Sequence, residues 1–264
     1  MDLRELAVTS SAAGRHPWEL ARADAVQFLL QVRAGLPARP AVLDFGCGDT
    51  FLVSRIARGL GAAEAYAVDR AFTPDLKSQL IEKYPDVSLF DSLPALEEAE
   101  KPEADLVLLL DVLEHCEDDL AVLDSLMESP AVSLDAKFLI TVPAFQGLFS
   151  KHDDFLGHYR RYSLGQLTRV VREAGLEVLE SSYFFSSLLL PRAVQVALER
   201  LSLSKAEPKG LGDYQGNAGR DAAIRGVLRA DFRVCQALAR VGIRIPGLSC
   251  YVLAGRNSRG ESGA

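Results

Sequence analysis

The chain has 264 residues, 48% of them hydrophobic and 25% charged, which is typical of a folded globular protein and excludes wholesale disorder. Its 29 Lys and Arg against 36 Asp and Glu give a net charge of −7, which argues against an enzyme that grips nucleic acid over a broad surface. We therefore expect a small-molecule partner and no nucleic acid. The four cysteines form no CxxC pair, and the first residues lack the apolar core of a signal peptide. These features predict a cytoplasmic protein without a disulfide framework or a zinc knuckle.

The predicted elements begin with a helix and then alternate between short apolar strands and helices. Apolar residues at three- and four-residue steps predict a helix from Pro17 to about Arg33. Strands are predicted at 41–45, 65–68, 87–90, 105–110, 137–142, 176–185 and 249–254, and helices at 50–60, 74–83, 111–127, 164–174, 188–203 and 221–241. This alternation predicts an α/β fold with a seven-stranded, mainly parallel sheet, helices on both faces, and a helical insertion before the last strand.

Three acidic motifs stand where predicted parallel strands end. The first strand runs into Asp44-Phe45-Gly46-Cys47-Gly48, a turn whose glycines let backbone approach a ligand closely. Asp69 ends the second strand, where a carboxylate can bind a ribose diol, and Asp111-Val112-Leu113-Glu114-His115 follows the fourth. A dinucleotide-binding GxGxxG is disfavoured because Phe51 occupies its sixth position. Together the motifs predict one nucleoside site.

With these motifs, residues 42–174 resemble the class I S-adenosylmethionine-dependent methyltransferases, which have a Rossmann-like fold. The resemblance implies that Asp44, Gly46 and Gly48 lie beside the methionine part of the cofactor. It also implies that Asp69 holds the ribose, that Asp91 meets the adenine amine, and that Asp111 lies beside the methionine amino group. Cys47, Arg70 and Val112 are predicted to belong to the same cofactor site. On this interpretation the chain is one domain, with an N-terminal helical segment (1–40), a cofactor-binding core (41–185), a helical insertion (186–247), and a last strand with a tail (248–264).

A polar loop follows the fifth strand and contains His152-Asp153 and Gly157-His158-Tyr159-Arg160-Arg161-Tyr162. It resembles the loop of a subgroup of bacterial biosynthetic methyltransferases. Because loops above a rigid sheet carry substrate contacts, we predict that the acceptor is bound here by Asp153, Tyr159, Arg160, Arg161 and Tyr162. The candidate bases for a hydroxyl or ammonium acceptor are His152, His158 and His115. Asp153 is expected to orient His152 or to cap a turn, and we expect no metal site.

The predicted function is methyl transfer from S-adenosylmethionine, with S-adenosylhomocysteine as product, to oxygen or nitrogen of a small or lipid-linked metabolite in a biosynthetic pathway. Two alternatives stay open: a protein or RNA methyltransferase, and a non-catalytic protein that binds the cofactor or a partner. The inserted helices are expected to form a lid over the acceptor or a contact between two copies. The apolar run 183–203, which carries arginines, favours weak contact with a membrane surface.

Overall fold

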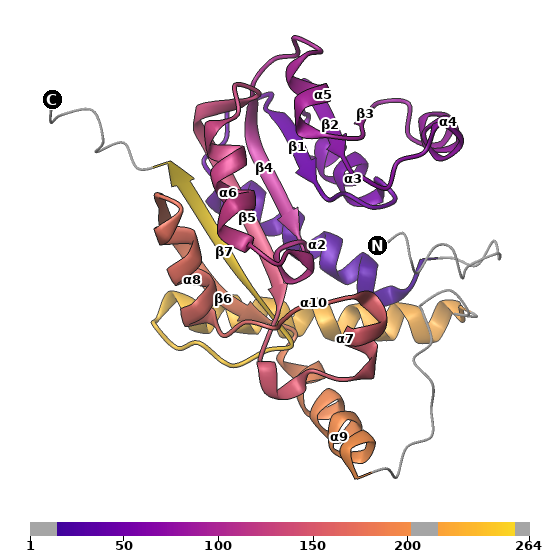
Figure 1. The fold of residues 1–264 in the computed structure, drawn as a ribbon. Coiled ribbons are helices and arrows are strands. Elements are labelled where there is room, and N and C mark those ends of the chain that lie inside the picture. Colours follow the sequence, from indigo (N-terminus) through magenta and orange to yellow (C-terminus); the bar gives the residue numbers. More distant parts are fainter. Residues whose placement is uncertain (1–14, 202–215, 257–264) are drawn as a thin grey trace, which may run out of the picture.

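The computed structural model describes residues 15–201 and 216–256 and contains a seven-stranded mixed sheet (Figure 1). Its strands are β1 (Ala41–Phe45), β2 (Glu64–Val68), β3 (Ser88–Phe90), β4 (Ala104–Leu110), β5 (Val132–Pro143), β6 (Leu176–Phe184) and β7 (Ser249–Arg256). They lie in the order β3-β2-β1-β4-β5-β7-β6, with β7 antiparallel to both of its neighbours and every other pair parallel. The predicted fold class is confirmed. The strand order reverses between β1 and β4, and open α/β sheets bind ligands at the carboxyl ends of such strands.

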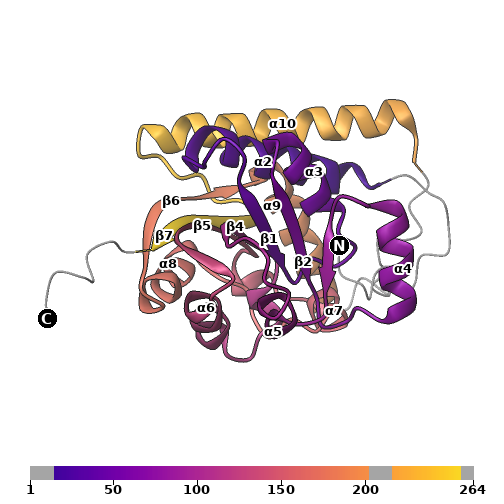
Figure 2. The same ribbon diagram turned by 90° about the horizontal axis from the view of Figure 1, so that it is seen from above.

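Helices cover both faces of this sheet, and β1 shows why (Figure 2). Val42 packs into a hydrophobic cluster on one face, and its neighbour Leu43 packs into a second cluster on the other. A strand buried on both faces must be apolar nearly throughout, as β1 and β4 are. The first face carries α2 (Pro17–Arg33), α3 (Phe51–Leu60) and α10 (Ala218–Arg240), the second carries α5 (Leu93–Glu97), α6 (Asp119–Glu128) and α8 (Leu164–Glu173), and α4 (Pro74–Lys83) lies beside β3.

The helix α2 lies between the sheet and α10, so it is held from two sides (Figure 2). Phe28 of α2 meets Phe232 of α10 edge to face, with ring centroids 5.7 Å apart. Asp24 of α2 forms ion pairs with Arg225 of α10 and with Arg55 of α3. The N-terminal helix is therefore an integral part of the domain, and its inner face reaches the sheet.

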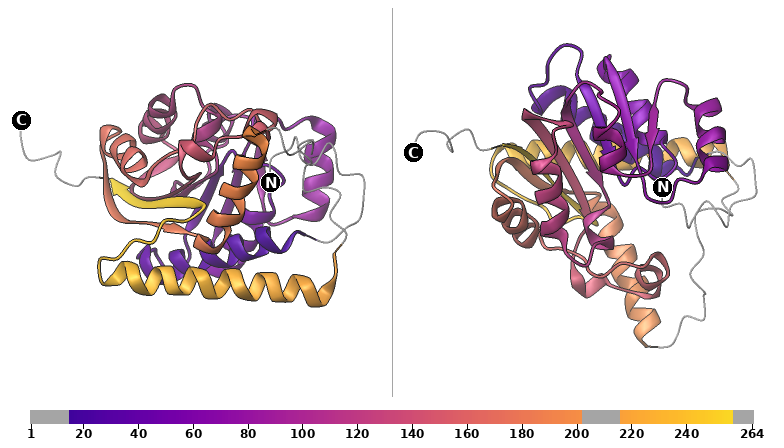
Figure 3. Two further views of the ribbon diagram at one scale, coloured as in Figure 1. Left: turned by 90° about the horizontal axis from the view of Figure 1, so that it is seen from below. Right: turned by 45° about the horizontal axis from the view of Figure 1, so that its top comes forward.

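The remaining short elements gather at the carboxyl ends of the parallel strands (Figure 3). They are η1 (Leu113–His115), η2 (Gln146–Leu148), α7 (Lys151–Leu156), η3 (Ser186–Leu188) and α9 (Leu189–Arg200). Within the described ranges, no helix combines the length and the hydrophobicity needed to cross a bilayer.

The prediction of one helix over 111–127 is wrong. Asp111 adopts a left-handed backbone with φ of 59°, which ends β4 in a sharp turn before η1. A separate helix, α6, then begins after Asp118, whose side chain accepts a hydrogen bond from the backbone N–H of Ala121 at 3.0 Å. The strand β5 also begins earlier than predicted, because Val132 pairs with Ala104 before an irregularity in the ladder.

Two short helices were not predicted, and one long helix begins earlier than expected. The helices α5 and α7 have only five and six residues, too few to show helical periodicity, and are started by the serine caps Ser92 and Ser150. The helix α10 begins at Ala218 because Asn217, rather than a later residue, caps it. Residues 1–14, 202–215 and 257–264, which include the end of the predicted helix 188–203, most of the predicted loop 204–219 and the predicted tail, lie outside the described residues.

Backbone strain concentrates at the carboxyl edge of the sheet. Of the five described residues other than glycine with positive φ, four lie just beyond the ends of β1, β4, β5 and β6, namely Thr50, Asp111, Phe145 and Phe185. The fifth, Glu100, precedes β4. A positive φ is unfavourable for residues that have a Cβ atom, and backbone strain of this type is found most often at functional sites. This edge is therefore where the functional residues are to be sought.

Candidate active site

The turn after β1 is shaped by a close approach between two of the predicted motifs. Gly46 has φ of 73°, and its N–H donates to the carbonyl of Val68 at 2.8 Å. A Cβ atom at Gly46 would lie only 2.8 Å from Cγ2 of Val112, so a side chain does not fit there. The turn and the segment after β4 therefore pack directly against each other.

Asp69, at the end of β2, is connected to the same turn. One carboxylate oxygen accepts the backbone N–H of Gly48 at 2.9 Å, and the other accepts that of Ala71, also at 2.9 Å. Each carboxylate oxygen can accept a further hydrogen bond. Asp69 is thus held in a fixed orientation and keeps acceptor capacity for hydroxyl groups.

Two buried side chains in this region each have an oxygen atom without a hydrogen-bond partner among the described residues. These atoms are Oδ1 of Asp44 and Oγ1 of Thr50. Burial raises the pKa of Asp44 to about 7, while the guanidinium of Arg22 lowers it. Orphaned buried polar groups are costly unless a ligand satisfies them. An ammonium or hydroxyl group of a ligand at this edge of the sheet could form hydrogen bonds with these two oxygens.

Arg22 is a site residue that the sequence analysis missed. It projects from α2, is buried, and forms an ion pair with Asp111 at 2.9 Å. It also donates to Oγ1 of Thr141 at 3.1 Å, and Thr141 in turn donates to Asp111 at 3.0 Å. Its position one turn after Trp18, on the inward face of the helix, is the signal that could have revealed it. The N-terminal helix therefore contributes a cation to the carboxyl edge.

The other predicted cofactor residues lie at the same edge in varied surroundings. Asp91, after β3, is exposed and pairs with Lys77 at 2.9 Å, and this hydrogen bond lowers the pKa of Asp91. Arg70 is exposed, and Val112 is buried against Gly46. Cys47 is also buried, and burial raises the pKa of its thiol. A neutral thiol is a poor nucleophile, so Cys47 serves the turn by its small size.

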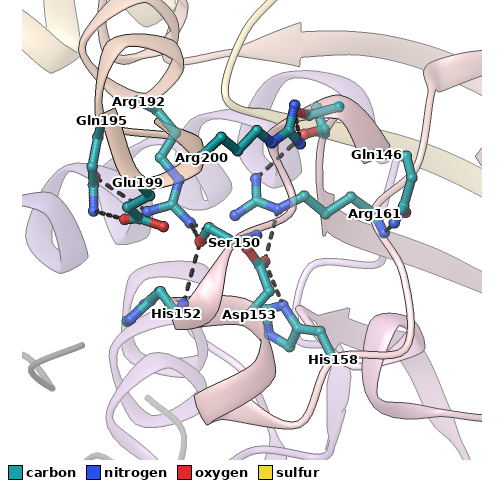
Figure 4. Close-up of polar contacts among 12 residues, drawn as sticks. Gln146, Ser150, His152, Asp153, His158, Arg161, Arg192, Gln195, Glu199 and Arg200 are labelled. Carbon is teal, nitrogen blue, oxygen red and sulfur yellow. Dashed lines mark hydrogen bonds and ion pairs between the residues drawn. The ribbon is translucent and has the colours of Figure 1, made fainter. Parts of the chain in front are cut away.

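Asp153 is the hub of the loop that follows β5 (Figure 4). This carboxylate is 0% exposed and pairs with Nδ1 of His158 at 2.9 Å and with Nε of Arg161 at 2.7 Å. It also accepts from the backbone N–H and hydroxyl of Ser150 and from Arg192 of α9. Burial alone would raise its pKa, but the bonds from His158 and Arg161 outweigh burial and hold the pKa well below its usual range. Asp153 is therefore an anion that fixes the ring of His158.

The expectation that Asp153 orients His152 is wrong, although Asp153 does cap a turn. The backbone of His152 donates to Ser150, and its ring stacks on Phe155 with centroids 6.4 Å apart. Burial lowers the pKa of His152, and the nearby Arg192 lowers it further. The carboxylate of Asp153 therefore holds His158 and not its neighbour in sequence, His152.

His158 meets two residues of η1, and the three form what we call the Glu–His cluster: Glu114, His115 and His158. The rings of His115 and His158 are edge to face with centroids 4.6 Å apart. One potential ligand atom from each of the three residues lies within 4.8 Å of the others. Burial, followed by the neighbouring Asp111, raises the pKa of Glu114 well above its usual range. The cluster brings together two of the predicted bases, His115 and His158, but not His152.

The other residues predicted to bind the acceptor mainly attach the loop to the segment after β4. The backbone N–H of Tyr159 donates to the carbonyl of Glu114 at 2.7 Å, and the Tyr159 side chain is 56% exposed. Arg160 donates to the carbonyls of residues 116 and 117, and the hydroxyl of Tyr162 donates to Asp119 at 2.7 Å. Arg161 and Tyr162 are buried. Their polar groups therefore hold the loop in place, and binding of the acceptor by these residues stays a prediction.

A comparison with models of protein families decides to which family this arrangement belongs. A methyltransferase domain model matches residues 18–181, well over half of the chain. The chain belongs to the class I S-adenosylmethionine-dependent methyltransferases. A search of the curated proteins found no match to this methyltransferase.

Solved structures share the fold of this methyltransferase at low sequence identity. They include an S-adenosylmethionine-dependent methyltransferase from Archaeoglobus fulgidus, with a TM-score of 0.51 and 17% identity over 90% of this chain and 97% of that one. The [4+2]-cyclase SpnF matches with a TM-score of 0.55 and 15% identity over 94% and 85%. A phosphoethanolamine N-methyltransferase from Haemonchus contortus, in complex with S-adenosylhomocysteine, matches with a TM-score of 0.50 and 17% identity over 88% of this chain and 52% of that one. These likenesses concern the fold alone.

Proposed function

We propose that this methyltransferase binds S-adenosylmethionine at the carboxyl edge of β1, β2 and β4 and transfers its methyl group to oxygen or nitrogen of a small or lipid-linked metabolite. The observation that carries the proposal is the contact between the two halves of the site. The segment after β4 packs with Val112 on the glycine turn and with His115 on His158, so one short stretch joins the cofactor side to the Glu–His cluster.

The residues present fit the cofactor. Asp69 has acceptor capacity for the ribose hydroxyls, and the orphaned oxygens of Asp44 and Thr50 can accept from or donate to polar ligand atoms. Asp111, held by Arg22, offers carboxylate charge to the methionine ammonium group. When bound, S-adenosylmethionine supplies a methyl group already activated by its sulfonium. The Haemonchus contortus enzyme of the same fold was solved with S-adenosylhomocysteine, which supports S-adenosylmethionine as the methyl donor.

The Glu–His cluster can supply proton removal, which an oxygen or nitrogen acceptor needs in addition to correct positioning. The acceptor must lose a proton as its lone pair takes the methyl group, and a placed histidine contributes about 10²- to 10⁴-fold to such a step. Because Asp153 pairs with Nδ1 of His158, Nε2 is the nitrogen left to act on the acceptor. The cluster is thus assigned to the deprotonation of the acceptor.

The surface of α9 favours a lipid-linked acceptor among these metabolites. Leu190, Val194, Leu198 and Leu201 recur at three- and four-residue steps, and all four are exposed, Leu190 by 72%. Arg192 and the buried Val196 lie on the opposite side of this helix, where Arg192 reaches Asp153, so the apolar row faces outward, away from the cluster. A row that faces outward in this way can rest on a lipid surface, which would bring the neighbouring cluster to an acceptor anchored in that surface.

The test is methyl transfer from isotope-labelled S-adenosylmethionine to a panel of sugar hydroxyls, phenols and amines, each offered free and attached to a lipid in detergent micelles. We expect transfer to at least one class, with the lipid-attached form preferred. His158→Ala should lower the rate by about 10²-fold or more, since the positioned base is lost. The matched control is His152→Ala, which should change the rate far less. Equal losses in the two variants would refute the role of His158, and preference for the free forms would refute the lipid-linked acceptor.

A further inference from the structure

We propose that Glu114, His115 and His158 bind a divalent transition-metal ion. This inference rests on the proposed function, because it explains how the Glu–His cluster deprotonates the acceptor. The sequence analysis expected no metal site. The three residues come from two segments more than 40 positions apart, and only the fold brings them together.

The first support is the state of Glu114. Its side chain is 0% exposed, and neither carboxylate oxygen has a hydrogen-bond partner among the described residues. A buried carboxylate without any donor is one of the most costly arrangements in a folded protein. Two imidazoles lie next to it, and a cation held between the three groups would supply the missing partner.

The second support is the spacing of the donor atoms. One donor from each residue lies within 4.8 Å of the other two. Metal bonds to imidazole nitrogen or carboxylate oxygen are ~2.0–2.2 Å, so two ligands of one ion lie at most ~4.4 Å apart. The cluster needs only a small closure, by rotation of side chains, to enclose an ion.

The third support is the surrounding shell, which is built like that of a metal site. Histidines that bind metals usually pair their second ring nitrogen with a carboxylate, and Asp153 does this for Nδ1 of His158. The two ligand segments are locked together by the hydrogen bond from Tyr159 N–H to the carbonyl of Glu114 at 2.7 Å. The ligands are therefore positioned before the ion arrives.

The donor set selects the kind of ion. Two imidazoles and one carboxylate suit Zn²⁺, Mn²⁺ or Fe²⁺, whereas Mg²⁺ and Ca²⁺ prefer oxygen ligands alone. Three protein ligands leave a coordination position for the acceptor oxygen. An acceptor hydroxyl bound there loses its proton to solvent water more readily, and the oxygen lone pair then takes the methyl group as the carbon–sulfur bond breaks. In this arrangement Nε2 of His158 binds the ion and acts on the acceptor through it, in place of taking the proton itself.

The test is metal binding by the full chain after treatment with EDTA. We expect about one equivalent of Zn²⁺ by calorimetric titration and elemental analysis, and a d–d absorption spectrum of nitrogen and oxygen coordination when Co²⁺ is added instead. Glu114→Gln keeps the shape of the side chain and should weaken Zn²⁺ binding by about a hundredfold or more, since changes even in outer-shell partners cost ~10–100-fold. The denaturation midpoint of each variant shows whether it folds, and His158→Ala is the second variant.

The control is His152→Ala, which removes a half-buried histidine of the same loop outside the cluster and should leave Zn²⁺ affinity unchanged. Equal Zn²⁺ affinity in the wild type and Glu114→Gln would overturn the metal site, as would undiminished methyl transfer by the EDTA-treated protein. Titration with S-adenosylhomocysteine distinguishes these failures from failure of the proposed function. If the protein binds S-adenosylhomocysteine but not Zn²⁺, only the metal site is refuted. If it binds neither, the proposed function is refuted as well.

Discussion

Gly46→Ala tests whether the glycine turn and the segment after β4 are packed as closely as the structure shows. The new side chain meets two obstacles. The left-handed backbone, with φ of 73°, costs ~1–2 kcal/mol for a residue with a Cβ atom. The Cβ would also lie 2.8 Å from Val112, and overpacking of this kind costs ~1–3 kcal/mol. We expect a loss of ~2–5 kcal/mol in the free energy of unfolding and weaker binding of S-adenosylhomocysteine.

Two comparisons separate these contributions. Gly35 has φ of 60°, and a Cβ atom added there would have no neighbour within 4 Å, so Gly35→Ala carries the backbone cost without the clash. Val112→Ala would leave the Val112 Cβ, at 3.6 Å, as the nearest atom and should relieve the clash in the double variant. Denaturant titration of the four proteins in the cycle measures the coupling. Equal losses for Gly46→Ala and Gly35→Ala, or no rescue by Val112→Ala, would refute the close packing.

Further predictions concern three polar groups. The folded pKa of Asp44, about 7, lies above the value of ~3.9 in an unfolded chain, so its contribution to stability is fully present below pH ~3.9 and is lost as the pH rises toward 7. Asp44→Asn should therefore gain stability relative to wild type as the pH rises from about 4 to about 7, by at most about 4 kcal/mol in all. A pH-independent difference in denaturation would contradict the buried carboxylate. Arg22→Ala leaves Asp111 without its cation and should lower the free energy of unfolding by up to ~3–5 kcal/mol, the cost of breaking a buried ion pair. Because Asp111 is partly exposed, solvent screening reduces this loss. A loss below ~1 kcal/mol in denaturant titration would show that the ion pair is unimportant. Tyr162→Phe removes the hydrogen bond to Asp119 and should cost ~1–3 kcal/mol, whereas Tyr159→Phe, at an exposed position, should be neutral by the same measurement.

The sequence predicted correctly that the acidic motifs after β1, β2 and β4 gather at one edge of the sheet, because their signals are local. Gly46, Asp69 and Asp111 each follow an apolar strand, and parallel strands bring their carboxyl ends to one edge. The seven-stranded sheet follows from the same alternation and is confirmed. One local feature was not predictable in this way. Asp111 adopts a left-handed backbone that ends β4 in a turn, and the helix-like spacing of apolar residues over 111–127 gives no sign of it.

The acceptor half depends on long-range pairing, which sequence spacing does not show. Asp153 stands next to His152 in sequence but pairs with His158, because α7 turns the chain between them. Arg22 reaches Asp111 from a distant part of the chain, and Glu114 meets His158 only through the packing of the loop on η1. Residue types predicted a polar, histidine-bearing site, and the tertiary structure decided which of these residues meet.

Calorimetric titration of the full chain with S-adenosylhomocysteine tests the central claim most directly, because it requires no knowledge of the acceptor. We predict binding by wild type and a roughly ten- to hundredfold weaker affinity for Asp69→Ala, from the ~1.5–3 kcal/mol of a charge-assisted hydrogen bond. Asp86→Ala, which changes an exposed carboxylate paired with Arg58, should bind as wild type does. No binding by wild type, or equal affinity in wild type and Asp69→Ala, would contradict a cofactor site at this edge of the sheet.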